Sequence, residues 1–526
     1  MRASRRRGLL ALVVAALLAV VACTGDDRAD APSATTTAAT GSGTVRVGVG
    51  GDLIVDPVEA SLASARDLMV IDLLHDGLTR LDADGIPEPG LAAEWEANDE
   101  LTAFRFHLDP VATFASGRPV TPEDVIASVE RVMKAGDTSL AALSLEPVSG
   151  FRAFVEGEAD HVSGLTAPDA STVRIGLETP LSVLPEVLSS PLLSVVDVDT
   201  IAGDDLASLD LTGEWAVASA DDGGLRVVRR ERSAGDLDAV ELRRYDDDEA
   251  AYDGFDAGQV DWAAVPSSRY DDALDDHGDD AFTPFQAELF FGMNVDGPTL
   301  GNAALREAIT RAIDRDSIVD AVYPELADPL STIVPAGVAG HDPDRCPDCA
   351  YDPEKAAAIV RFAFRGDPPP TVHIDFDQSD PQRQMAERIA DDLDAVGIPT
   401  ELRSLPLDDY KEFVVSGDQE LFSLGWIGAY ASSDAYLAPL FGSAANDNLT
   451  GYRSAAVDGL LARARAGADR AKNAERWVGA ETRILEAWIV VPIAQFRTQV
   501  VVADRVEGLV HAVDGTVDWS QVHLAE

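Results

Sequence analysis

The sequence predicts an α/β protein, and three stretches support this prediction. Residues 371–402 indicate a strand, a helix and a second strand in succession, because alternating apolar residues give way to helical spacing and then return. Residues 173–262 are rich in short apolar runs separated by acidic turns, which favours β structure. Residues 469–488 place apolar side chains at the intervals of one long helix. A β-α-β unit needs a right-handed crossover, so part of the sheet structure should be parallel.

The remaining strands are expected near the two ends of the chain. Residues 44–50 alternate and lead into a turn-rich loop, and residues 101–108 alternate again. After the long helix, residues 489–496 and 498–502 should be extended. No short repeat occurs along the chain, which excludes solenoids and propellers.

One helix start is marked clearly. Thr121 can cap the helix, Pro122 occupies the first helical position, and Asp124 can reach back to complete a capping box. Apolar residues at helical spacing follow, so one face of this helix should be buried.

Composition excludes two classes of protein. The chain has 526 residues, 92 acidic against 41 basic, a formal net charge of −51, and 46% hydrophobic residues. A disordered acidic chain would have too few apolar residues to reach this figure. Nucleic-acid binders use Lys and Arg to displace counterions from phosphates, so nucleic acid is not an expected partner. The chain should be a globular protein of several domains.

The first 43 residues predict export. Four arginines precede an apolar run, residues 8–22, that is too short to span a bilayer comfortably and has the flanks of a secretory signal peptide, residues 1–22. The run ends in Ala22 followed by Cys23, which resembles a bacterial lipobox, so Cys23 should carry a lipid anchor at the membrane. The alternative is an ordinary cleavage site beside an unrelated cysteine. Residues 23–43 are small and polar and should form a disordered linker.

Cys346 and Cys349 are the other two cysteines. Four zinc ligands would need a second pair, which the sequence lacks, so a structural zinc site is not expected. In an oxidising compartment a local disulfide is the first interpretation. A redox-active pair remains the alternative, although the motif does not open a helix after a strand as that chemistry prefers.

Motifs for catalysis are missing. The sequence has no G-x-S-x-G, no H-E-x-x-H and no phosphate-binding G-x-x-x-x-G-K-[ST]. Six aspartates between Asp271 and Asp280 lack the spacing of a calcium loop and should form a solvated face. We therefore expect no catalytic residue, no metal and no cofactor, although a hidden pair of carboxylates stays open.

Eight segments, taken in order, resemble one family. They are residues 73–96, 114–125, 290–294, 304–323, 351–360, 421–441, 450–461 and 488–496. Together they resemble the extracellular solute-binding proteins of the peptide/nickel class, family 5, which supply ABC importers. The resemblance covers essentially all of residues 44–526.

The resemblance implies a two-lobed, periplasmic-binding-protein-like fold that closes on its ligand like a hinged trap. The first lobe would comprise residues 44–288 and 490–526, with an additional small domain inserted at about 65–175. The second lobe would comprise residues 289–489. Such a receptor suits transport because ligand contacts to both lobes stabilise the closed state, which an importer can then recognise.

The implied solute site centres on Gly425–Tyr430. Trp426 would offer a flat apolar wall, and Gly425 and Gly428 would let a ligand or the opposite lobe approach closely. Ordinary core packing is the alternative for Trp426. Peptide-binding members carry an Asp, which pairs with the peptide's ammonium, at the position of Ala429. This departure puts a typical free-amine peptide in doubt, because the charge-assisted hydrogen bond would be lost.

Three further residues complete the expected site. Asp434 would replace the missing carboxylate if its loop bends inward, although a position on the loop surface is the simpler expectation. Ser61 and Leu62, after the turn at Asp56, are the expected contacts from the first lobe.

The expected function is that of an exported, lipid-anchored binding protein, not an enzyme, at the outer face of the membrane. It would capture a peptide-like or other small solute and deliver it to an ABC importer permease, acting as a monomer. The first alternative is a ligand-sensing envelope lipoprotein that keeps the fold without transport, and the second is a secreted hydrolase with an unrecognised site.

Overall fold

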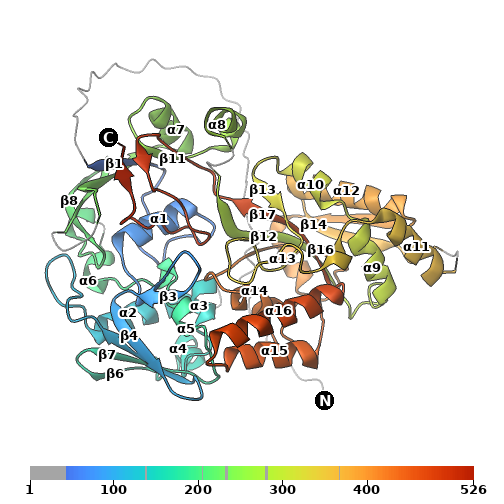
Figure 1. Ribbon diagram of the computed structural model, residues 1–526, viewed down its shortest axis with the longest axis horizontal. Coiled ribbons are helices and arrows are strands. Elements are labelled where there is room, and N and C mark those ends of the chain that lie inside the picture. The colour runs from blue at the N-terminus through green and yellow to red at the C-terminus, as the bar shows by residue number, and fades with distance from the viewer. Residues whose placement is uncertain are drawn as a thin grey trace.

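The computed structural model describes residues 43–136, 139–203, 205–230, 235–278, 282–365 and 368–525. The predicted signal peptide, Cys23 and all of the predicted linker except Gly43 lie outside these ranges. Among the described helices, none is long and apolar enough to cross a membrane. Strands and helices form a mixed α/β fold with two lobes, and the long strands β12 and β17 of the second-lobe sheet lie where the two lobes meet (Figure 1).

The first lobe is built on a mixed sheet. Strand β1 lies near its centre and runs parallel to both β10 and β11. In spatial order the strands are β18 (Val500–Val502), β11 (Trp262–Ala264), β1 (Thr44–Gly50), β10 (Ala239–Tyr245), β9 (Gly224–Arg229) and β8 (Trp215–Asp221). The associated helices are α1 (Ala65–Leu74), α6 (Val198–Ile201), α7 (Asp248–Asp256) and α8 (Tyr270–His277). The predicted strands at 44–50 and 498–502 are confirmed, the second in shortened form.

An antiparallel sheet of its own lies in the part of the first lobe expected to be inserted, and the elements β2 to α5, residues 79–187, are called the inserted domain below. In spatial order its strands are β4 (Ala92–Ala97), β5 (Ala103–Leu108), β7 (Thr172–Gly176) and β6 (Leu165–Asp169), with β2 (Thr79–Leu81) and β3 (Pro87–Pro89) as a separate ladder. Its helices are α2 (Pro122–Met133), α3 (Leu140–Ser144), α4 (Phe151–Val155) and α5 (Leu184–Val187). The helix start is as predicted, because Thr121 and Asp124 exchange both hydrogen bonds of a capping box before α2.

The second lobe contains the third sheet. In spatial order its strands are β13 (Ala327–Pro329), β17 (Val490–Arg497), β12 (Pro284–Met293), β16 (Leu421–Ile427), β14 (Val372–Asp377) and β15 (Thr400–Leu405). The predicted β-α-β unit is β14-α12-β15, and its two strands are parallel. The helices are α9 (Ala303–Ala312), α10 (Arg315–Val322), α11 (Pro353–Ala363), α12 (Asp380–Ala395), α13 (Leu407–Val414), α14 (Asp434–Phe441), α15 (Ala455–Arg465) and α16 (Arg470–Glu486). A short ladder of β19 (Val506–Glu507) and β20 (His523–Leu524) ends the chain.

The apolar clusters do not follow one domain each, and the expected insertion at about 65–175 stays a prediction. Helix α1 contributes Met69 and Leu73 to the cluster of the first-lobe sheet but Leu68 to the main cluster, and α5 contacts β2. The chain changes sheet near 282–284 and 497–500, because β12 and β17 belong to the second-lobe sheet. The apolar cluster of the inserted domain continues into the second lobe, while the first-lobe sheet has a cluster of its own.

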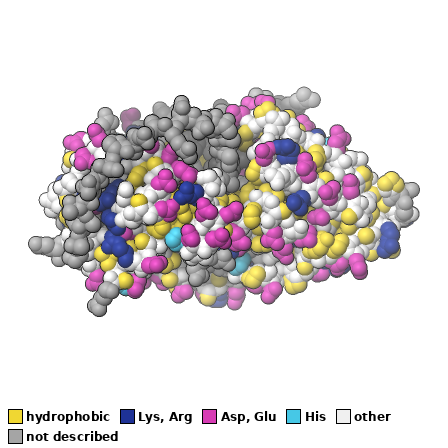
Figure 2. All heavy atoms as spheres, turned by 90° about the horizontal axis from the view of Figure 1, so that it is seen from above, with side chains coloured by type: hydrophobic (Ala, Val, Ile, Leu, Met, Phe, Trp, Pro, Cys, Tyr) yellow, Lys and Arg dark blue, Asp and Glu magenta, His cyan; other side chains and the backbone are white. Residues whose placement is uncertain are grey.

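The surface is strongly acidic. Figure 2 shows acidic side chains spread over both halves of the molecule, with few Lys and Arg side chains among them. Asp271, Asp272, Asp275 and Asp276 are exposed on α8, as expected for a solvated face, while Asp279 and Asp280 lie outside the described residues.

Candidate solute site

The site segment begins inside the second-lobe sheet. Strand β16 is buried along its whole length between β12 and β14, so Gly425 and Trp426 are interior strand residues. The Trp426 side chain lies opposite Glu288 of β12 and is 6% exposed. Its indole N–H donates to the carbonyl of Ala435 at the start of α14 over 2.9 Å. The indole is therefore part of the core, with its polar atom satisfied.

Gly428 has a close neighbour in its own lobe. A Cβ built on Gly428 would lie 2.7 Å from the hydroxyl oxygen of Tyr436. The same hydroxyl donates to the carbonyl of Gln286 over 2.9 Å, and the N–H of Gly428 donates to that carbonyl over 3.2 Å. Tyr436 of α14 therefore gives the glycine a structural reason within its own lobe, and the close approach of a solute or of the opposite lobe stays a prediction.

Asp434 is the most constrained residue of the segment. Its side chain is fully buried at the first position of α14. Arg465 donates to Oδ1 from Nε over 2.7 Å and to Oδ2 from Nη2 over 2.8 Å. The hydroxyl of Tyr430 adds a third hydrogen bond to Oδ2 over 2.7 Å. The expected position on a loop surface is wrong, because the carboxylate is held inside by a bidentate ion pair.

The ion pair determines whether Asp434 can serve in place of the carboxylate that is absent at residue 429. Ala429 is half-buried and packs against the main core, so it offers no acceptor. Asp434 already holds a cation, so its carboxylate does not replace the family's Asp as a free acceptor. Burial, followed by the Asp434 charge, raises the pKa of the Tyr430 hydroxyl well above its usual value, so Tyr430 remains a donor. Burial alone would lower the pKa of Arg465, but the Asp434 carboxylate raises it.

Ser61 and Leu62, the two residues expected to contact the solute from the first lobe, differ in their exposure to solvent. Ser61 is exposed, and its hydroxyl oxygen accepts a hydrogen bond from the N–H of Ala63 over 3.2 Å. Leu62 is 9% exposed and belongs to the main apolar core. The turn before them is held by Asp56, which forms an ion pair with Arg131 of α2. Of the two, Ser61 is the residue whose side chain is accessible.

A C-terminal loop that the sequence did not single out joins the lobes. The carbonyl of Val513 accepts a hydrogen bond from the N–H of Gln286 on β12 over 2.8 Å. A Cβ on Gly337 would lie 2.9 Å from the Cβ of Val513, so the loop also fits closely against the second lobe. On its other side, the N–H of Val517 donates to Asp72 of α1 over 3.2 Å.

Sequence reasoning also missed the contacts of α15 and α16 with the inserted domain. Ser182 donates from its N–H to the carbonyl of Arg465 over 2.7 Å and from its hydroxyl to the carbonyl of Ala464 over 2.9 Å. Nearby, Glu186 of α5 forms an ion pair with Arg470 of α16. A basic residue in the last turn of a helix is common because it complements the helix dipole, so nothing in the sequence marked Arg465.

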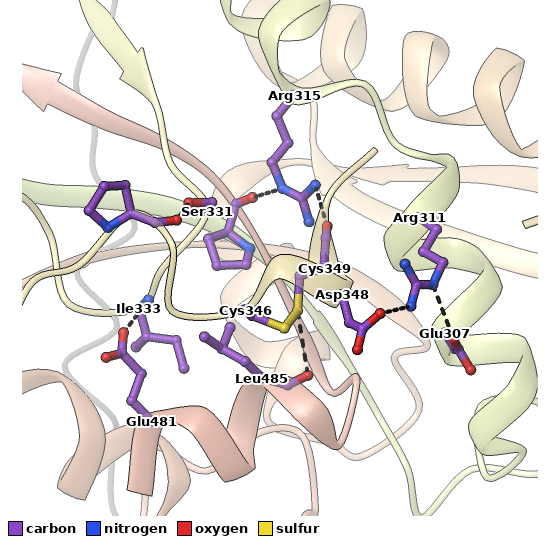
Figure 3. The surroundings of a disulfide bond; sticks show 12 residues. Glu307, Arg311, Arg315, Ser331, Ile333, Cys346, Asp348, Cys349, Glu481 and Leu485 are labelled. Carbon is purple, nitrogen blue, oxygen red and sulfur yellow. Dashed lines mark hydrogen bonds and ion pairs between the residues drawn. A yellow bond between two sulfur atoms is a disulfide. The ribbon is translucent and has the colours of Figure 1, made fainter. Parts of the chain in front are cut away.

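The predicted disulfide is confirmed (Figure 3). Cys346 and Cys349 are bonded, and the Sγ of Cys349 lies 3.9 Å from the carbonyl oxygen of Leu485 on α16. The preceding loop is held by Glu481, whose Oε1 accepts the N–H of Ile333 over 2.9 Å and whose Oε2 pairs with Arg345 at 3.2 Å. The bond therefore ends a loop that is anchored on α16.

That loop reaches the solute-site segment. The hydroxyl of Ser433 donates to the carbonyl of Ala339 over 2.8 Å, and the side chain of Gln495 bonds the N–H and carbonyl of Ala336 over 2.7 and 2.8 Å. Within the described ranges, no group of three or more His, Cys, Asp or Glu side chains could hold a metal ion.

Comparison with known proteins identifies the family. Residues 87–448 match the model of the bacterial extracellular solute-binding proteins, family 5 Middle. The chain is 22% identical over 485 residues to the oligopeptide-binding protein OppA of Bacillus subtilis (strain 168), covering 86% of this chain and 88% of OppA. It is 22% identical over 468 residues to heme-binding protein A of Haemophilus influenzae, covering 81% and 82% of the two chains.

A solved structure has the same fold. The unliganded open form of MppA, a periplasmic murein tripeptide-binding protein, superposes with a TM-score of 0.82 at 20% identity, covering 92% of this chain and 97% of MppA. The family model alone spans more than half of the chain. This protein therefore belongs to the family 5 bacterial extracellular solute-binding proteins, the receptors that serve ABC importers.

Proposed function

We propose that this protein is a lipid-anchored receptor, held at the outer face of the membrane through Cys23, that captures a small solute between its lobes and presents it to an ABC importer. It binds the solute without converting it and works as a monomer.

The solute is not held by an N-terminal ammonium at residue 429. One observation carries this part of the proposal: Ala429 stands where peptide-binding members have a carboxylate, and Asp434 is already paired with Arg465. An unpaired ammonium in a closed cleft would lose its water without gaining an acceptor. The relatives include proteins named for oligopeptides and one named for heme, so the family pocket accommodates different chemistries. A peptide-like solute with a blocked amine, or a non-peptide solute, fits these residues.

The test compares trialanine with N-acetyl-trialanine by titration calorimetry. The wild type should not prefer the free amine. Ala429→Asp should gain a preference of about tenfold or more for trialanine, because a charge-assisted hydrogen bond contributes about 1.5–3 kcal/mol. Ala429→Asn is the matched control, since it has the same shape without the charge. A wild type that binds trialanine tenfold more tightly than the acetylated peptide would refute the proposal.

Native mass spectrometry of the purified protein addresses the solute directly. A closed cleft retains ligand, so a defined mass in excess of the polypeptide identifies the solute class. Recovery of the solute unchanged after prolonged incubation supports binding without turnover, whereas a product of altered mass would contradict it.

A further inference from the structure

Arg465 lies between the buried carboxylate of Asp434 and the solvent. The side chain of Asp434 has no exposed surface, whereas 32% of the Arg465 side chain is exposed. The guanidinium contacts both carboxylate oxygens, and Tyr430 donates to one of them as well. Asp434 therefore has three donors, and the solvent side of this group is occupied by the arginine.

The same arginine is positioned from the inserted domain. Its backbone carbonyl accepts the N–H of Ser182, and the side chain of Asn473 reaches the Ser182 hydroxyl over 3.4 Å. Glu186, 6% exposed, lies close enough for the Asp434 charge to raise its pKa further, after burial as the main cause. Glu186 is therefore within electrostatic reach of Asp434, and its own ion-pair partner is Arg470.

We propose, building on the proposed function, that Arg465 is a specificity-determining residue whose guanidinium takes the place beside Asp434 that a solute's ammonium would otherwise take. The site accepts a solute that is neutral or anionic at this end. A solute with a free ammonium is rejected, because it would meet a like charge and an acceptor that is already satisfied.

This arrangement differs from the simple loss of an acidic residue. The sequence replaces the family's acid with Ala429, and five residues later it provides Asp434, which Arg465 covers. The protein therefore retains a carboxylate near the segment together with an internal cation. Removing the cation, without adding any acid, should make the carboxylate available to a ligand.

The test uses Arg465→Met, which keeps a long side chain and removes the charge. Trialanine and N-acetyl-trialanine are titrated by calorimetry against the wild type and the variant. Arg465→Met should gain at least a tenfold preference for the free amine. The gain should disappear in Asp434→Asn/Arg465→Met, which removes both charges, and should not occur in Arg465→Lys, which keeps the cation.

The double variant separates this role from a structural one. Both Arg465→Met and Asp434→Asn/Arg465→Met lose the guanidinium, but only Arg465→Met keeps the Asp434 carboxylate that would receive an ammonium. A preference for trialanine that is equally large in the two variants would overturn the proposal.

A second variant covers the case in which Arg465→Met fails to fold, since it leaves a buried carboxylate unpaired. Asp434→Asn leaves the Arg465 guanidinium without its carboxylate. Succinyl-trialanine, which carries an added negative charge, should therefore bind to Asp434→Asn at least tenfold more tightly than it binds to the wild type. Equal binding of succinyl-trialanine to the variant and the wild type would overturn the proposal.

The Ala429→Asp experiment tests the proposed function separately. If Ala429→Asp gains trialanine binding while the peptide affinities of Arg465→Met and Asp434→Asn equal those of the wild type, only the proposed role of Arg465 fails.

Discussion

Glu288 of β12 lies directly opposite Trp426 of β16 in the second-lobe sheet. The Glu288 side chain is 1% exposed, and its Oε1 has no hydrogen-bond partner in the structure. Burial, with a smaller contribution from the neighbouring carboxyl of Glu481, raises the pKa of Glu288 well above its usual value of 4.5. The indole therefore packs beside a carboxylic acid that stays neutral far above the pH at which an exposed glutamate ionises.

Glu288→Gln should stabilise the protein increasingly as pH rises. Below pH 4.5 the group is protonated in both folded and unfolded chains, so its burial carries no ionisation penalty. Above that pH the unfolded chain releases the proton and the folded protein does not, so wild-type stability falls until the folded pKa is reached. Gln does not ionise, and the variant should gain about 1.4 kcal/mol for each pH unit between the two pKa values.

Urea unfolding of both proteins at pH 4, 6 and 8 measures this difference. Asp271→Asn, an exposed change on α8, is the control and should show little pH dependence. A difference between Glu288→Gln and the wild type that stays constant from pH 4 to pH 8 would contradict the assignment of a raised pKa.

Substitutions of Trp426 should lower the free energy of unfolding. Trp426→Phe loses the hydrogen bond to Ala435 and should cost about 1 kcal/mol, while Trp426→Ala should cost about 3–5 kcal/mol because it empties a core position. Denaturant unfolding measures both.

A role of Trp426 in solute binding stays a prediction. Trp426→Ala should weaken binding of the native solute by more than about 1 kcal/mol, and Trp426→Phe, which keeps an aromatic ring, should weaken it less. If the folded Ala variant binds with unchanged affinity, Trp426 is a core residue only.

Removing the disulfide should loosen the loop that reaches the solute site. Cys346→Ser/Cys349→Ser should lower the free energy of unfolding by about 2 kcal/mol, from the entropy of a very short closed loop. Amide hydrogen exchange should increase in residues 331–345 and in 428–433, which the loop contacts through Ser433. Strand β5, in the inserted domain, should keep its protection. Faster exchange in β5 as well would indicate a global effect.

Cys23 should determine where the protein is found. Cys23→Ala should move the protein from the membrane fraction to the soluble fraction, because the proposed lipid attachment site would be lost. Immunoblots of fractionated cells measure the distribution, with Cys346→Ser/Cys349→Ser as the control that keeps the anchor. Retention of Cys23→Ala in the membrane would count against acylation at this residue.

Local patterns predicted much of the fold. The capping box of Thr121 and Asp124 begins α2 as expected, and the β-α-β unit of residues 371–402 appears as parallel β14 and β15 joined by α12. These features depend on residues within one or two turns of each other, so the sequence contains the information directly. The disulfide could be predicted for the same reason, because its two cysteines are only three positions apart in the sequence.

The site was predicted less well, and Gly428 and Asp434 show why. Gly428 was expected to let a ligand or the opposite lobe approach, and nothing in the sequence indicated the Tyr436 hydroxyl that lies beside it. Asp434 was expected on a surface, but Arg465 holds it inside. Whether a side chain is buried depends on which distant segment covers it, and no periodicity records that.

The family, the mixed α/β class and the replacement of the usual acid by Ala429 could all be inferred from the order of residues, and the export signal could be predicted from it. That a second carboxylate lies nearby and is covered by a cation is seen only in the folded chain. Asp434 begins α14 and Arg465 ends α15. Ser182, much earlier in the chain, donates its backbone N–H to the carbonyl of Arg465. A buried ion pair forms only where folding brings both charges together out of water, so its partners are chosen by the packing of the domains.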